Sequence, residues 1–239
     1  IKISLNMKTK KLSFFEVRKP VSRFLSWSLV LYLIFQGIVE AGDFVGLAKV
    51  SSGPVLYGLS RITQSGVGHF LLLLLNTGLL LSFYECFRRS LSKVKSLLSY
   101  IVLAIMTLMV CDFLLSMSPD TTTDLLHQVQ NPSRFSVFAS HFRVASSVLQ
   151  NILSIILSVT LIVKFRGRIA AYGWVYLGCT FLTAVGFGYL YKFLANTDVD
   201  FLNRGLAAAW TAFRYVVGVL PIVFMRRTLI FNEIKDSET

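Results

Sequence analysis

Six ionisable side chains interrupt long apolar stretches of this sequence, and they are the first candidates for chemistry. Carboxylates, imidazoles and guanidinium groups can bind ligands, transfer protons or hold a metal ion. An ionisable group inside an apolar membrane segment is costly and marks a functional position by default. These candidates for ligand binding are Glu40, His69, Asp112, His141, Arg143 and Arg214.

No motif of known catalytic chemistry accompanies these residues. The sequence contains no HExxH, no GxSxG, no P-loop and no GxGxxG fingerprint. His69 and His141 could together ligate a haem, or a metal ion with Asp112 and His127, but no close pair such as HxxxH occurs. The three cysteines have no CxxC spacing, which argues against a disulfide framework and a zinc site. The sequence therefore predicts no metal ligands, leaves any cofactor open and assigns no catalytic residue.

Six apolar runs must position the candidates. The chain has 239 residues, of which 54% are hydrophobic and 15% charged, and its mean hydropathy is +0.66. About 20 apolar residues cross a bilayer as a helix, because lipid offers no partner to the backbone. We therefore expect an all-α polytopic membrane bundle spanning 24–227, between a basic cytoplasmic segment (1–23) and a cytoplasmic tail (228–239). The runs are Phe24–Ala41, Gly66–Phe87, Leu97–Ser118, His141–Val163, Ile169–Tyr191 and Gly205–Met225.

Basic residues predict the orientation of the bundle. Of the 24 Lys and Arg, 17 lie in the N-terminal segment and in 88–95, 164–168 and 226–239. The positive-inside rule places all four segments, and so both termini, in the cytoplasm. Orientation in a membrane thus explains the net charge of +12 better than nucleic-acid binding does. The first run is longer than the apolar part of a signal peptide and is interpreted as a retained span; Met7 is an alternative start.

The candidate residues then gather in the outer half of the bundle. At 1.5 Å per residue, Asp112 lies roughly 9 Å and Arg214 about 14 Å from the outer end of its run. A lone midplane arginine costs at least about 2.5 kcal/mol, so we expect Arg214 to pair with Asp112, or with Glu40 as the alternative. We also expect His69 and His141 to face one pocket with Asp112. The alternative interpretation is that the shallow residues contact headgroups and that the deep pair is purely structural.

The connections between the runs carry turn residues. Asp43–Ser65 contains several glycines and is predicted as a loop, and 196–204 as a polar loop. Three threonines before Asp124 predict the start of a short helix, which Pro132 ends. Four glycines in 169–191 favour close helix packing in lipid.

Three short motifs together carry a family resemblance. They are Val50–Gly58 leading to Asn76–Leu80, Ser118–Asp120 followed by His141, and Asn203–Leu206 followed by Trp210. With these motifs the chain resembles, over most of 24–227, a prokaryotic multi-span family known as domain of unknown function 998. The Ser-Asp-Leu-Gly pattern expected after the first run is absent. The resemblance implies the multi-span fold and a prokaryotic cytoplasmic membrane, and it implies no activity.

Three functions agree with these features. The first is binding of a small amphiphile or lipid headgroup in a polar pocket of the outer half. The second is an enzyme, metal-dependent or not, acting on a lipid-linked substrate through Asp112 and the histidines. The third is a secondary transporter, although Pro221 is the only proline inside a run and no clear repeat is visible. Expected partners are membrane lipids and a small amphiphilic ligand, with no nucleic acid.

Overall fold

The computed structural model describes residues 12–48, 54, 58, 63, 66–94, 96–116, 134–195 and 200–231. Within these ranges the side chains of 43, 46–48, 116, 136, 184, 187–195 and 200–204 are not described. Long helices make up almost all of the described chain. They are α1 (Lys19–Ala48), α3 (Gly66–Lys93), α4 (Leu98–Ser116), α6 (Arg134–Lys164), α7 (Gly167–Ala195) and α8 (Asp200–Thr228).

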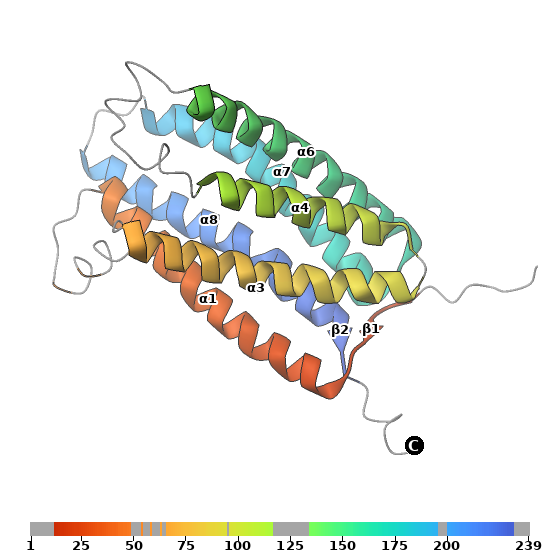
Figure 1. Cartoon of the computed structure of the whole chain (residues 1–239). Helices are drawn as coiled ribbons and strands as arrows, with labels where there is room; N and C mark the ends of the chain where they lie inside the picture. Colours follow the sequence, from red (N-terminus) through yellow and green to blue (C-terminus); the bar gives the residue numbers. More distant parts are fainter. Residues whose placement is uncertain are drawn as a thin grey trace, which may run out of the picture.

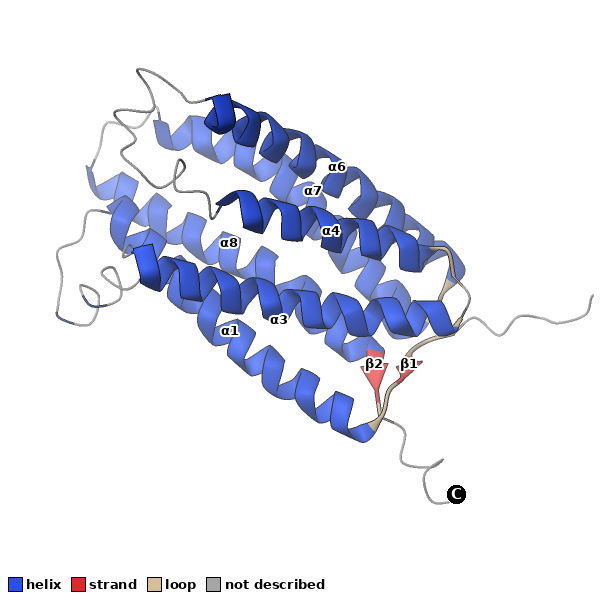
Figure 2. Cartoon of the chain, in the orientation of Figure 1, coloured by secondary structure: helices blue, strands red, loops and turns tan. Residues whose placement is uncertain are grey.

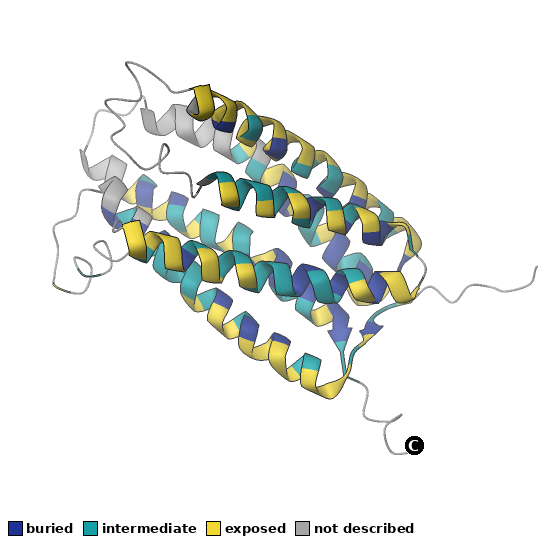
Figure 3. Cartoon of the chain, in the orientation of Figure 1, coloured by how far each residue is buried: buried dark blue, intermediate teal, exposed yellow. Residues whose placement is uncertain are grey.

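The helices have the length and the surface of membrane spans. Helices α1, α3, α4, α6 and α8 are each long and apolar enough to cross a membrane, and α7 has 29 residues. Large apolar side chains cover the outside of the bundle; Trp27, Val67 and Phe181 are 71%, 73% and 65% exposed (Figure 3). Exposing such an apolar surface to water would be unfavourable, whereas contact with lipid acyl chains is not. The predicted all-α polytopic bundle is confirmed, and it is compatible with an integral membrane protein.

The helices form a closed ring. Going round it, α1 packs on α3, α3 on α4, α4 on α6, α6 on α7, α7 on α8 and α8 back on α1 (Figure 1). Neighbours in the ring run in opposite directions, because the chain turns back at each connection. Among the described residues, α3 and α8 also contact each other, although they are not adjacent in this order.

Two short strands close one end of the ring. Strand β1 (Phe15–Glu16) pairs in parallel with β2 (Leu229–Ile230), and Phe15 lies opposite Leu229 (Figure 2). The N-terminal segment is also bonded to the link between α6 and α7, since the amides of Arg166 and Ile169 donate to the carbonyls of Leu12 and Ser13. Both ends of the described chain are thereby fastened to the same end of the bundle.

Gly167 makes the contact between this link and the N-terminal segment feasible. Its φ is +58°, a conformation that disfavours side chains with a Cβ. A Cβ added there would lie 2.9 Å from Cβ of Ser13. Glycine is therefore needed at this position both for the turn and for the close approach.

The tightly packed core lies at the strand end of the bundle. Its fully buried side chains include Leu25, Phe87, Leu161 and Tyr172 (Figure 3). The ring of Phe15 is 3% exposed and packs edge-on against Phe87 and Phe165, with centroids 5.6 and 5.9 Å apart. The core therefore reaches beyond 24–227 into the two flanking segments, because an aromatic side chain of the first strand fills the mouth of the ring.

Three predicted boundaries are wrong. Helix α1 begins at Lys19 and continues to Ala48, past the predicted loop start at Asp43. Helix α6 begins at Arg134 rather than at His141, and α8 begins at Asp200 within the predicted polar loop. A helix satisfies its own backbone, so it can extend through glycines and polar residues past the apolar run. The short helix expected at 124–130 lies outside the described residues.

Reporter fusions test the orientation, which remains a prediction from the charges. Fusions after residue 95, 166 or 235 are expected to behave as cytoplasmic, and fusions near 60, 128 or 198 as external, because the basic segments stay inside. A phosphatase reporter and a fluorescent reporter at each position give opposite readouts and control each other. A reversed result at one pair of loops would contradict six crossings.

Candidate functional site

A cavity lined by both polar and apolar residues lies on the axis of the ring. Its volume is about 310 Å³, and side chains or backbone from all six helices line it. The polar groups in its wall are amides and hydroxyls, and none of the lining residues is an acid, a base or a histidine. The polar lining consists of Tyr32, Tyr84, Gln150, Asn151, Ser154, Tyr176, Thr180 and Thr183, and the apolar lining includes Leu80, Ile105, Met109, Val217 and Ile222.

A hydroxyl cluster joins three helices in the wall of the cavity. The Tyr176 hydroxyl lies 2.8 Å from the Ser154 hydroxyl and 3.2 Å from the Tyr84 hydroxyl, so α7 is hydrogen-bonded to α6 and to α3. The Tyr176 ring stacks on Tyr172 at 5.5 Å, and Tyr172 packs on Phe87 at 5.3 Å. With Phe15 on Phe87, this aromatic column fills the axis from the cavity to the strand end. The cavity therefore has a closed floor on that side.

Removal of one hydroxyl from this cluster is expected to cost stability. Tyr176→Phe leaves two buried hydroxyl groups without their partner, so we expect a loss of about 1–3 kcal/mol in the free energy of unfolding. Tyr172→Phe is the matched control on the same helix, because the buried Tyr172 hydroxyl has no hydrogen-bond partner in the part of the chain that the structure describes. The control should be neutral or stabilising in reversible unfolding in mixed micelles. Equal losses for both variants would contradict the assigned hydrogen bonds.

Pro221 adds a backbone acceptor to the cavity wall. Proline has no N–H, so the carbonyl of Val217, four residues earlier, receives no hydrogen bond from that position. Both residues line the cavity. The next carbonyl, of Gly218, accepts from the Tyr32 hydroxyl at 3.3 Å. Helix α8 therefore lacks one of its regular backbone hydrogen bonds at residues that line the cavity.

Asp112 lies behind one wall of the cavity. Its Oδ2 accepts from the Ser146 hydroxyl at 2.9 Å and from Gln150 Nε2 at 2.7 Å. Its Oδ1 is buried and has no hydrogen-bond partner among the described residues. Because Nε2 of Gln150 is used by Asp112, the side-chain oxygen of Gln150 stays available as an acceptor at the cavity. Asp112 therefore orients a lining residue rather than lining the cavity itself.

An ion pair between two helices joins Arg214 to Glu40. Arg214 Nε lies 3.3 Å from Glu40 Oε2, across the contact between α8 and α1. Gln36 Nε2 donates to Glu40 Oε1 at 2.9 Å, and Asn76 Nδ2 donates to Gln36 Oε1 at 2.8 Å. The first-ranked partner, Asp112, is wrong and the alternative is confirmed. Asp112 has a suitable depth, but α4 is no neighbour of α8 in the ring.

The remaining candidates lie on the outside of the bundle. His69, His141 and Arg143 are all exposed, and none of them lines the cavity. The histidines are on α3 and α6, which are separated by α4 in the ring. In the described part of the chain no group of three His, Cys, Asp or Glu could hold a metal ion. Among the described residues, no contact joins the two histidines to each other or to Asp112, so the predicted shared pocket has no support there.

Sequence reasoning missed a stripe of hydroxyl residues along α7, of which Tyr176, Thr180 and Thr183 line the cavity. Tyr172, Tyr176, Thr180 and Thr183 follow one another at intervals of four, four and three residues. That spacing places them on one face of a helix. A polar stripe along an otherwise apolar membrane helix was the available signal, although it is weaker than a charge because hydroxyls can also bond to their own helix, as Thr180 does to the Tyr176 carbonyl.

No model of a protein family, no curated protein and no solved structure matches this chain. The resemblance over 24–227 stays a prediction.

Proposed function

We propose that this membrane protein binds a small, neutral, amphiphilic molecule in the central cavity. The observation that carries the proposal is a cavity lined by residues of all six helices, in which the polar side chains are hydroxyls and amides and none of the lining residues is charged. Burying an unpaired charge in such a wall would be costly, whereas a neutral polar head could exchange its water for these groups. The apolar residues in the wall would contact the rest of the ligand.

Size and hydrogen-bonding capacity narrow the ligand class. A volume of about 310 Å³ lies at the lower end of the range for small-molecule pockets. The Gln150 carbonyl, positioned through Asp112, and the Val217 carbonyl freed by Pro221 offer acceptors, and Asn151 offers both a donor and acceptors. These groups suit a compact head that carries hydroxyl or amide groups. On the predicted orientation, the cavity would lie on the outer side of the aromatic column.

Analysis of molecules bound to the purified protein tests the proposal. The wild type in nanodiscs should carry a neutral amphiphile in about one-to-one ratio after washing, detected by mass spectrometry of the extract. Asn151→Leu keeps most of the side-chain volume and removes the amide, and we expect about a tenfold loss of this molecule, as one unmade hydrogen bond of about 1.4 kcal/mol implies. Ser147→Ala, on the exposed side of α6, is the control.

The binding experiment has one supporting result and two contradicting results. Retention by the control together with loss in Asn151→Leu supports binding in the cavity. Equal amounts in all three proteins, or a bound molecule with a permanent charge, would contradict the proposed ligand and site.

A further inference from the structure

A second pocket lies at the strand end, between α1 and α3, on the outside of the packed core. Its volume is about 330 Å³. Three cationic side chains reach it from two segments of the chain: Arg18 precedes α1, and Arg89 and Lys93 lie one turn apart on α3. No acidic residue is among its lining side chains. The other lining residues are Val17, Val21, Cys86 and Ser90.

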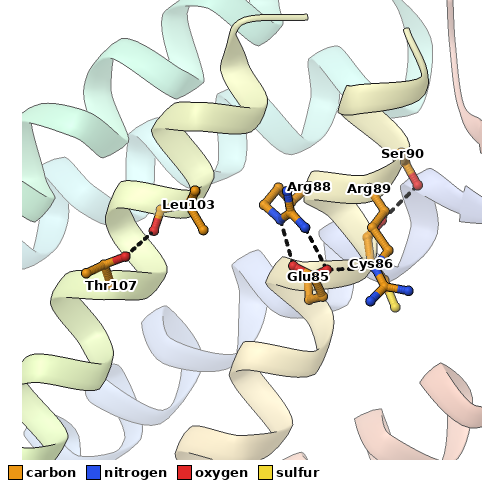
Figure 4. Close-up of polar contacts among 7 residues, drawn as sticks. All are labelled: Glu85, Cys86, Arg88, Arg89, Ser90, Leu103 and Thr107. Carbon is orange, nitrogen blue, oxygen red and sulfur yellow. Dashed lines mark hydrogen bonds and ion pairs between the residues drawn. The ribbon is translucent and has the colours of Figure 1, made fainter. Parts of the chain in front are cut away.

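The positive charge of this pocket is mostly uncompensated. Arg18 and Lys93 are exposed, and neither forms an ion pair with a described residue. The nearest acid on α3, Glu85, is shared by two arginines: Arg88 donates to both of its oxygens at 2.7 and 2.8 Å, and Arg89 Nε donates at 2.6 Å (Figure 4). One carboxylate therefore compensates only one of these two guanidinium groups.

Glu85 also positions Arg89. The bond to Nε holds the guanidinium group from one side, while its two terminal nitrogens have no partner among the described residues. A guanidinium group held in this way can present parallel N–H donors to a phosphate, which is its preferred geometry for that anion. Lys93, four residues later on the same face of α3, adds a point charge beside it.

We propose that this pocket binds the phosphate group of an anionic phospholipid. The arrangement of two arginines and a lysine at the basic end of a membrane bundle, in a pocket between two helices, is the kind that suits such headgroups. Val17 and Val21 form an apolar wall next to the cations. Further along α1, Phe24 and Trp27 are 53% and 71% exposed, so acyl chains would meet an apolar surface below the headgroup. A free phosphate ion would use only the cations.

Thermal unfolding in detergent with defined lipids tests this site. For the wild type, phosphatidylglycerol should raise the unfolding temperature by about 2–4 °C more than phosphatidylcholine does. Arg18→Gln combined with Lys93→Gln should abolish this difference. The matched control is Lys164→Gln combined with Arg168→Gln, which removes the same charge from exposed positions at the same end but outside the pocket. The control should keep the full difference.

Three results would overturn the proposal. They are no difference between the lipids in the wild type, an equal reduction in both double variants, and a full rise with inorganic phosphate at constant ionic strength in place of lipid. The first excludes the site, the second indicates general charge attraction and the third indicates a free anion. Native mass spectrometry gives an independent readout, with one retained phosphatidylglycerol expected on the wild type and the control and none on the pocket variant. Retention on all three proteins would also overturn the proposal.

Discussion

Arg214→Leu is expected to lower the free energy of unfolding by about 3–5 kcal/mol, because it leaves a buried carboxylate without its counter-charge. The Glu40 side chain is only 5% exposed. Its other oxygen accepts from Gln36, a neutral side chain that cannot replace the positive charge. Reversible unfolding in mixed detergent micelles, followed by circular dichroism, measures the loss.

The double variant Glu40→Leu with Arg214→Leu should recover most of this stability, since removing both partners leaves no buried charge. Asp112→Leu with Arg214→Leu is the matched comparison and should be no more stable than Arg214→Leu alone. Comparison of these two double variants therefore distinguishes Glu40, the partner observed in the structure, from Asp112, the partner predicted from its depth. Recovery with Asp112→Leu and none with Glu40→Leu would contradict the ion pair.

Phe15→Ala should destabilise the bundle by about 3–5 kcal/mol, although the residue lies outside every apolar run. The ring is 3% exposed and touches Phe87 and Phe165. Its truncation would open a cavity at the foot of the aromatic column and weaken the link between β1 and β2. The same unfolding assay measures the change.

Phe24→Ala provides the control for this prediction. The same side chain is lost, but Phe24 is 53% exposed on α1, so the change should stay within about 0.5 kcal/mol. If both variants lose equally little, Phe15 does not fill the end of the ring and the N-terminal segment does not belong to the core.

The packed core at the strand end and the central cavity are two neighbouring parts of the bundle. The strand end is packed with apolar and aromatic side chains, and the polar groups Gln150, Asn151 and Ser154 lie above it around the central cavity. A packed end gives the cavity a fixed floor, and the hydroxyl cluster on Tyr176 fixes part of its wall. Stability changes at either place should therefore also alter ligand occupancy.

The sequence by itself determined the class of fold, and it predicted a depth for each polar residue. Span length follows from bilayer thickness, and backbone satisfaction in lipid requires helices, so neither depends on which helices are neighbours. Depth along a helix follows from 1.5 Å per residue. For these reasons the six-helix bundle is confirmed. Helix ends were less predictable, because helices extend past their apolar runs, as α1 does to Ala48.

Only the tertiary structure decided which residues meet. Two side chains at one depth can face each other or lie on opposite sides of a ring, and the choice depends on helix order and rotation, which the packing of many side chains sets together. Asp112 and Glu40 were both within reach of Arg214 by depth, yet only α1 is the neighbour of α8 on that side. The same reason explains Phe15: its burial arises from pairing with Leu229, a contact between the two ends of the chain that no local pattern encodes.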